Sequence, residues 1–144
     1  MRTRVAHRFL ALSGLAVVTL LGACGRKASG GSAALAVSEI QLGRSLNADL
    51  SIQDQTTTFR PTDVIYASVA TKGSGNGTIN AKWTYQDGQQ VSADSRSIAP
   101  NGPAHTEFHI SKPSGWPEGK YRVEIMLNGA SAGTKDFEVK SQGK

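Results

Sequence analysis

TINAKWTYQ, residues Thr78–Gln86, is the stretch that decides the fold of this 144-residue chain. Apolar side chains occupy every second position of it, namely Ile79, Ala81, Trp83 and Tyr85, and polar side chains fill the positions between. Successive side chains of a strand point to opposite faces of a sheet. The alternation therefore predicts a β-strand with one face in a core and the other in solvent.

Segments on both sides show β patterns as well. They are Asp63–Thr71, Ala104–Ser111, Lys120–Leu127 and Thr134–Val139. Between Ile40 and Ile52 the apolar residues fit either strand alternation or a weak helical spacing through Leu42, Leu46 and Leu50, and we favour a strand there.

Two dipeptides between predicted strands indicate hairpins. Asp87-Gly88 and Asn128-Gly129 tolerate positive φ at both centres of a type I′ turn, so each is expected to join antiparallel neighbours. Short strands at this spacing predict an all-β fold, a two-sheet antiparallel sandwich of about seven strands.

The region from about residue 36 to residue 140 resembles the immunoglobulin-like and fibronectin-III-like sandwiches of bacterial envelope proteins. The resemblance rests on Trp83 at an inward strand position, on the run PEGKYRV at Pro117–Val123, and on the closing Phe137–Val139. It implies that the hydroxyl of Tyr121 ties its strand back to a loop. The chain lacks the inter-sheet cysteine pair of antibody domains, and a fold of this kind implies no particular ligand.

The N-terminus has the layout of a bacterial signal peptide. Residues 1–8 (MRTRVAHR) are basic, and residues 9–23 form an apolar run that ends in small residues. A membrane-spanning helix needs about 20 apolar residues, and this run stops short of that length before the polar GRKASGGS. We therefore expect residues 1–23 to be removed rather than to span the membrane.

The end of that run, Leu21-Gly22-Ala23-Cys24, resembles the lipobox of bacterial lipoproteins. The resemblance implies cleavage after Ala23 and a diacylglyceryl group on the Cys24 thiol. The alternative is an ordinary signal peptide with an incidental cysteine. Leu21 disfavours this alternative, because ordinary cleavage sites have a small residue at the third position before the cut. Cys24 is the only cysteine of the chain, so no disulfide is expected.

The residue after the cysteine is Gly25, not the aspartate that usually retains lipoproteins of Gram-negative bacteria at the inner membrane. By resemblance to that rule we expect an outer-membrane address facing the periplasm. Residues 24–35, rich in glycine, serine and alanine, form the predicted acylated cysteine and flexible tether, and residues 36–144 form the predicted sandwich domain. The membrane is thus a predicted partner, through the lipid anchor.

The formal net charge of +5 does not indicate nucleic-acid binding. Without Arg2, Arg4 and Arg8 of the signal peptide, 13 basic residues face 11 acidic ones, and the remaining cations are spread singly except for Arg26-Lys27. We expect no nucleic-acid partner. There is also no Gly-x-Ser-x-Gly nucleophile motif, so we expect no enzyme and no cofactor, with an envelope hydrolase kept as the second alternative.

The clearest sign of a chemical site in the sequence is the alternation of His105, Glu107 and His109. Alternate residues of one strand project from one face, so these three side chains could offer metal ligands. We favour a solvated face and keep a periplasmic metal-binding lipoprotein as the first alternative.

Trp116, flanked by Gly115 and Pro117, is either an exposed anchor for an envelope protein or glycan, or a plug over the open end of the core. We favour the plug. The resulting hypothesis is a lipid-anchored, non-catalytic sandwich that acts as a binding or structural module.

Overall fold

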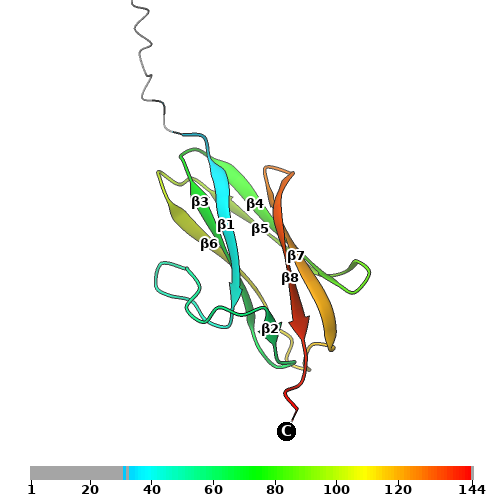
Figure 1. Ribbon diagram of the computed structural model, residues 1–144. Coiled ribbons are helices and arrows are strands. Elements are labelled where there is room, and N and C mark those ends of the chain that lie inside the picture. Colours follow the sequence, from blue (N-terminus) through cyan, green and yellow to red (C-terminus); the bar gives the residue numbers. More distant parts are fainter. Residues whose placement is uncertain (1–30, 32, 144) are drawn as a thin grey trace, which may run out of the picture. The chain divides into compact units, whose positions relative to one another are not determined.

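A computed structural model of the chain describes residues 31 and 33–143, and every regular element in them is a β-strand (Figure 1). No helix in these residues is long and apolar enough to cross a bilayer. The strands are β1 (Ala36–Gly43), β2 (Thr58–Phe59), β3 (Ile65–Lys72), β4 (Gly77–Tyr85), β5 (Gln89–Ile98), β6 (Ala104–Ile110), β7 (Gly119–Leu127) and β8 (Ala130–Val139).

The strands form two sheets, with the order β1-β3-β6 in one and β2-β8-β7-β4-β5 in the other. All pairings are antiparallel except that of the two-residue β2 with β8. The predicted fold class, an all-β two-sheet immunoglobulin-like sandwich, is confirmed, with seven long strands and one short one. In variable-type immunoglobulin domains, the sheet formed by strands G, F and C has a further strand beside strand C. β5 occupies the corresponding position beside β4.

The core lies between the sheets and is built from the faces that the alternation predicts. Ile79, Ala81 and Trp83 of β4 are buried, and Trp83 is wholly inaccessible to solvent. Its ring meets that of Phe137 edge to face at 5.9 Å, and Phe137 meets Phe59 of β2 in the same way at 5.6 Å. Edge-to-face contacts of this kind add to the burial of aromatic area, so these rings tie β4, β8 and β2 together.

The two predicted hairpin turns differ in outcome. Asn128 and Gly129 have φ of +52° and +82° and connect the paired Leu127 and Ala130, as a two-residue type I′ turn requires. The Asp87-Gly88 prediction is wrong in detail. The loop has three residues, 86–88, and its positive φ values fall on Gln86 and Gly88. The reason is a bulge between Trp83 and Thr84, which shifts the register of β4 against β5 before the turn.

The strand that we favoured through Ile52 is wrong beyond Gly43. β1 contains Ile40 and Leu42, and residues 44–57 then form an ordered loop in which Leu46 bridges to Ile52. Arg44 holds this loop, because its guanidinium bonds to the Asp63 carboxylate at 2.9 Å and to the Thr58 carbonyl at 2.7 Å. These contacts end the strand although the apolar pattern continues.

β5, which sequence patterns did not predict, forms an edge of the five-stranded sheet. Its inward positions carry Asp94 and Arg96, opposite Ala81 and Ile79 of β4. Charged side chains pointing inward on an edge strand are a known protection against edge-to-edge aggregation. Arg96 also reaches across to Glu107 of β6, at 3.4 Å, and lies 5.6 Å from the Phe108 ring centre, so it closes this side of the sandwich.

Candidate functional site

The predicted lipidation and sorting residues, Ala23, Cys24 and Gly25, lie outside the described residues, so cleavage, acylation and sorting stay predictions. The structure does describe where the chain enters the domain. Ala33 and Ala34, which we assigned to the tether, lie against the β3–β4 loop, where the Ser74 amide donates to the Ala33 carbonyl at 3.0 Å. The N-terminal segment therefore joins the sandwich at the end that carries this loop.

The histidine face of β6 has the predicted alternation, since His105, Glu107 and His109 alternate with the buried Thr106 and Phe108. Each member of the face already has a protein partner. Glu107 Oε2 lies 3.0 Å from His109 Nδ1 and Glu107 Oε1 lies 3.4 Å from Arg96, whereas His105 Nδ1 lies 3.2 Å from Ser68 Oγ. Within residues 31 and 33–143 no group of three or more His, Cys, Asp or Glu side chains is placed to hold a metal ion. The geometry thus offers no support for the metal-binding alternative.

Sequence reasoning missed the pair of Ser68 and His105, because the two residues come from different strands. The pKa of Asp49 is lowered mainly by the hydroxyl and amide of Ser51, with a smaller electrostatic contribution from His105. A serine, a histidine and an acid are the residues of a hydrolase triad. Ser68, however, is only 2% exposed, so its hydroxyl offers no nucleophile to a substrate from solution.

Trp116 lies in the β6–β7 loop and is 8% exposed. Its amide donates to the Pro61 carbonyl at 2.7 Å, and its ring meets Tyr121 edge to face at 6.3 Å. Its indole nitrogen is buried without a hydrogen-bond partner. These contacts favour the plug interpretation: the indole closes the end of the core. Its role as a partner contact stays an untested prediction.

The tyrosine corner expected from the resemblance is present. The Tyr121 hydroxyl donates to the Pro117 carbonyl at 2.7 Å and so ties β7 to the preceding loop. Burial, with a smaller contribution from Tyr85, raises the pKa of Tyr121 to about 12, so the hydroxyl stays a donor at every physiological pH. The neighbouring Tyr85 hydroxyl donates to the Glu118 carbonyl at 2.8 Å. The loop around Trp116 is therefore rigidly held.

Two surface depressions flank the 86–88 turn and share Tyr121. The first, which we call the aromatic depression, has a volume of about 430 Å³. It lies between the β5 edge and the β6–β7 loop, and is lined by Tyr85, Gln89, Gln90, Val91, Ser111, Lys112, Trp116, Pro117 and Tyr121. Apolar ring surface inside and exposed amide and ammonium groups at the rim are the features of a site that takes a small or extended amphipathic ligand.

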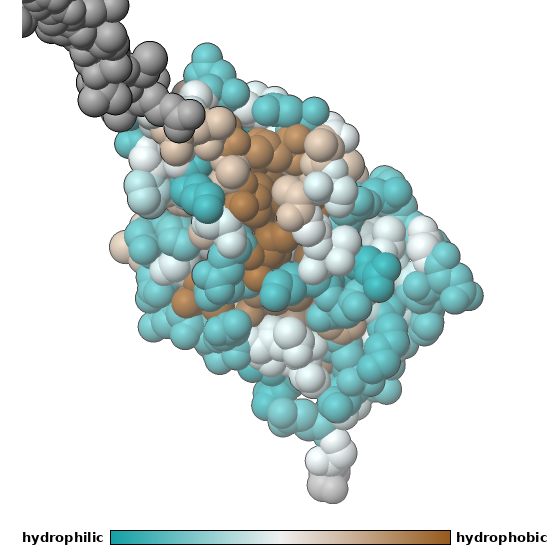
Figure 2. Space-filling model, turned by 45° about the horizontal axis from the view of Figure 1, so that its top comes forward, coloured by the Kyte–Doolittle hydropathy of each residue, from teal (hydrophilic) through white to brown (hydrophobic). Residues whose placement is uncertain are grey.

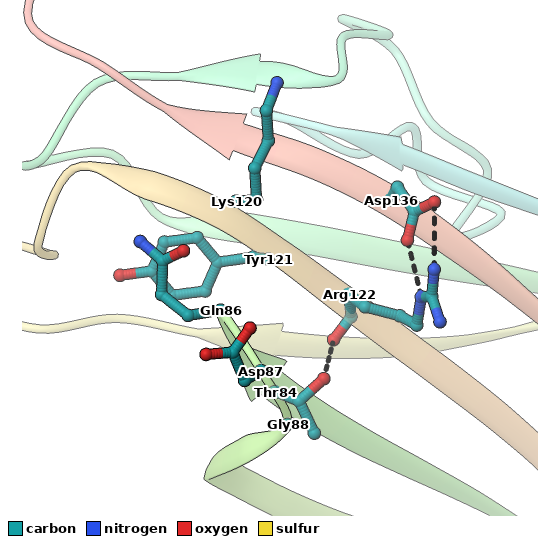
Figure 3. A pocket seen from close by; sticks show the side chains of 8 residues that line it. All are labelled: Thr84, Gln86, Asp87, Gly88, Lys120, Tyr121, Arg122 and Asp136. Atoms are coloured by element: carbon teal, nitrogen blue, oxygen red, sulfur yellow. Dashed lines mark hydrogen bonds and ion pairs between the residues drawn. The ribbon is translucent and has the colours of Figure 1, made fainter.

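The second, the charged depression, has a volume of about 540 Å³ and lies on the solvent face of the five-stranded sheet (Figure 3). Arg122 and Asp136 face each other across β7 and β8 in a two-point ion pair of 2.6 and 3.3 Å. The hydrogen bond from Arg122 lowers the pKa of Asp136. Lys120, beside them, points to solvent and reaches Glu138 at 3.5 Å. The depression therefore presents fixed charges of both signs.

Comparison with known proteins identifies a fold and no family. No protein-family model matches the chain, and no curated protein matches it in sequence. The C-terminal domain of wzt superposes with a TM-score of 0.52 at 9% identity, over 76% of this chain and 75% of that one. At that identity the likeness shows the sandwich fold alone.

Two other solved structures are similar at a slightly lower TM-score of 0.49. An immunoglobulin-like protein from Pseudomonas aeruginosa matches at 17% identity, over 77% of this chain and 100% of that chain. The alkylpurine DNA glycosylase AlkC of Pseudomonas fluorescens matches at 13% identity over 74% of this chain. This chain covers only 30% of that enzyme.

Proposed function

We propose that this protein is a lipoprotein of the bacterial cell envelope, anchored through Cys24, whose sandwich domain works as a non-catalytic binding module. The observation that carries the proposal is Leu21-Gly22-Ala23-Cys24, which closes a fifteen-residue apolar run and stands directly before a polar tether. A single acyl chain binds membranes only marginally, whereas two or three chains hold a protein stably. Full modification of Cys24 is therefore part of the proposal.

The binding role is supported by the aromatic and charged depressions. Both lie at the end of the sandwich opposite the entry of the N-terminal segment. A domain tethered at one end leaves its other end free to meet a partner in the envelope. Rigid side chains such as Tyr85 lose little conformational entropy on binding, which suits a recognition surface. We propose an envelope protein or a glycan as the partner.

The non-catalytic character is supported by the engagement of the titratable groups described above. His105 and His109 face Ser68 and Glu107, and Ser68, the serine that contacts a histidine within the described residues, is buried. General acid–base chemistry needs a group that reaches a bound substrate. Neither histidine lines the aromatic or the charged depression.

The anchoring half of the proposal is tested by growing cells that express the parent or Cys24→Ser with an alkyne-tagged fatty acid. The parent should incorporate the tag and resist extraction from membranes at alkaline pH, because its thiol is the only acyl acceptor of the expected type. The serine variant should remain unprocessed or be released. Recovery of the serine variant at mature size in alkali-washed membranes would contradict the proposal.

The binding half is tested by placing a photo-crosslinking amino acid at Gln90, on the rim of the aromatic depression, and at Glu39 on β1 as a matched exposed control. Irradiation of intact envelopes should give a discrete adduct from position 90 and none from position 39. Equal adducts from both positions, or none from either, would contradict a binding site in this depression.

A further inference from the structure

The end of the sandwich where the N-terminal segment enters, here called the tether end, is assembled from four segments: residues 33–38, 71–78, 97–104 and 126–133. Hydrogen bonds that the backbone amides donate connect three of them. The Gly75 amide donates to Pro100 at 3.2 Å, the Gly102 amide donates to Gly73 at 3.0 Å, and the Thr78 amide donates to the Asn128 side chain at 2.9 Å. The tether end is therefore one continuous, ordered surface.

This surface is almost free of charge. Among those four segments, all within the described residues, Lys72 is the only side chain that is formally charged at pH 7. The remaining positions carry alanine, glycine, serine, threonine, proline, asparagine, methionine or aliphatic side chains. These segments contain no carboxylate that would repel the anionic headgroups of a bilayer. The ammonium group of Lys72 would attract those headgroups.

The distal end differs in its charge. Its loops, strand ends and C-terminal segment carry Arg44, Asp49, Asp54, Arg60, Asp63, Asp87, Lys112, Glu118, Lys120, Arg122, Asp136, Glu138 and Lys140. The two ends are thus suited to different surroundings, one close to lipid and one in water.

The tether end also presents apolar side chains. Leu35, Val37 and Leu127 are half-buried there, and Leu35 and Leu127 close over Gly77, where any β-carbon would collide with Leu35. Figure 2, with this end turned forward, shows a hydrophobic band that runs from the upper part of the view to its middle, with hydrophilic side chains on both sides of it and below it. The area is modest, so docking depends on a second attachment.

The N-terminal chain supplies that attachment. Gly31 is only seven positions after Cys24 in the sequence, and a fully extended chain spans at most about 3.6 Å per residue. An acyl group on Cys24 therefore keeps the tether end within roughly 25 Å of the bilayer, where its effective concentration at the lipid surface is high. Arg26 and Lys27, between the two, add two cations that anionic headgroups attract.

We propose that the tether end of the sandwich docks on the surface of the lipid bilayer, so that the domain stands with its distal end and both depressions pointing away from the membrane. The inference rests on the proposed anchoring at Cys24 and adds to it a defined orientation. A free tether would let the domain tumble, whereas docking would present the distal end to a partner continuously.

The test uses the full, acylated protein in vesicles of phosphatidylethanolamine and phosphatidylglycerol. A second cysteine is the only free thiol in such a protein, so Ala99→Cys at the tether end and Ser114→Cys at the distal end can each carry one fluorophore. With a quencher on the lipid headgroups, the label at 99 should be quenched about twofold more than that at 114, because docking brings it to the lipid interface. Equal quenching of vesicle-bound protein would overturn docking.

Charge reversal of the surface provides a second measurement. Ala130→Glu at the tether end should abolish the extra quenching at position 99, and Ala93→Glu on β5 is the matched control that should leave it unchanged. Both positions are exposed, so folding is not at stake. Equal effects of the two variants would overturn the proposal.

Two further outcomes are distinguishable. A disulfide dimer through position 99 on vesicles would assign this surface to a second copy of the chain and would also overturn the proposal. Protein that fails to float with the vesicles would contradict the lipid anchor itself rather than the docking.

Discussion

Trp116→Ala separates the two roles that a loop tryptophan beside a surface depression can play. Trp116 is nine-tenths buried and contacts Tyr121, so its removal opens a cavity at the end of the core. Replacing a buried tryptophan by alanine costs about 3–5 kcal/mol. The buried indole nitrogen has no hydrogen-bond partner. Because the substitution removes this unsatisfied donor, the expected cost lies at the lower end of that range, about 3 kcal/mol.

The assay is thermal unfolding, followed by circular dichroism, of the mature chain carrying Cys24→Ser to keep it soluble. Each kcal/mol shifts the midpoint of a domain of this size by roughly 4 °C, so the expected loss is about 12 °C. Trp83→Ala, at a wholly buried site, should cost at least as much. Lys112→Ala is the matched control at the exposed side of the ring and should cost under about 1 kcal/mol.

A second readout gives the result that would refute the reasoning. If Trp116 were an exposed anchor, Trp116→Ala would melt within a degree or two of the parent while partner recovery from envelopes collapsed, since interface aromatics are often worth about 2 kcal/mol or more. That combination would show that the indole closes no core in solution.

Three further predictions concern sorting, the histidine face and acid stability. Gly25→Asp should retain the protein at the inner membrane, and unchanged co-sedimentation with outer-membrane markers would show that its address is set elsewhere. The double variant His105→Ala, His109→Ala should bind Zn²⁺ no worse than the parent by calorimetry, whereas stoichiometric Zn²⁺ in the parent that the variant loses would favour the metal-binding alternative. Burial raises the pKa of Asp63, but the Arg60 amide and the Arg44 guanidinium outweigh it and hold that pKa below its usual value. The ionised Asp63 side chain therefore stabilises the fold at neutral pH. This stabilisation is lost as the pH falls below about 3.9, the usual pKa of an aspartate, and through the lower pKa of Asp63 in the folded protein. Asp63→Asn should consequently lower the melting temperature more at pH 7 than at acid pH, and a deficit that stays constant as the pH falls would contradict this linkage.

Some strands of the sandwich could be predicted because each has one face in the core and one in water. β4 and β7 have this environment, and their alternation survives in the sequence. The turn at Asn128-Gly129 was predictable for a local reason. It needs a positive φ at two successive residues, and few residues other than asparagine and glycine adopt a positive φ easily.

β5 escaped prediction for an equally physical reason. It is an edge strand whose inward positions carry exposed charged side chains, so its polarity does not alternate. The end of β1 was missed because Arg44 is held by Asp63 and Thr58, residues distant in the sequence. The pairing of Ser68 with His105, and the gathering of Tyr85, Gln90 and Trp116 in one depression, depend likewise on strand order that no local pattern reveals.

The acylation of Cys24 is the claim on which anchoring, orientation and address all depend. Mass spectrometry of the N-terminal peptide of the protein, purified from membranes without heating in alkali, tests it directly. The account predicts a peptide that begins at Cys24 and carries the added mass of a diacylglyceryl group, with or without a further acyl chain on its amine. A peptide that begins at any other residue, or an unmodified Cys24 thiol, would contradict it.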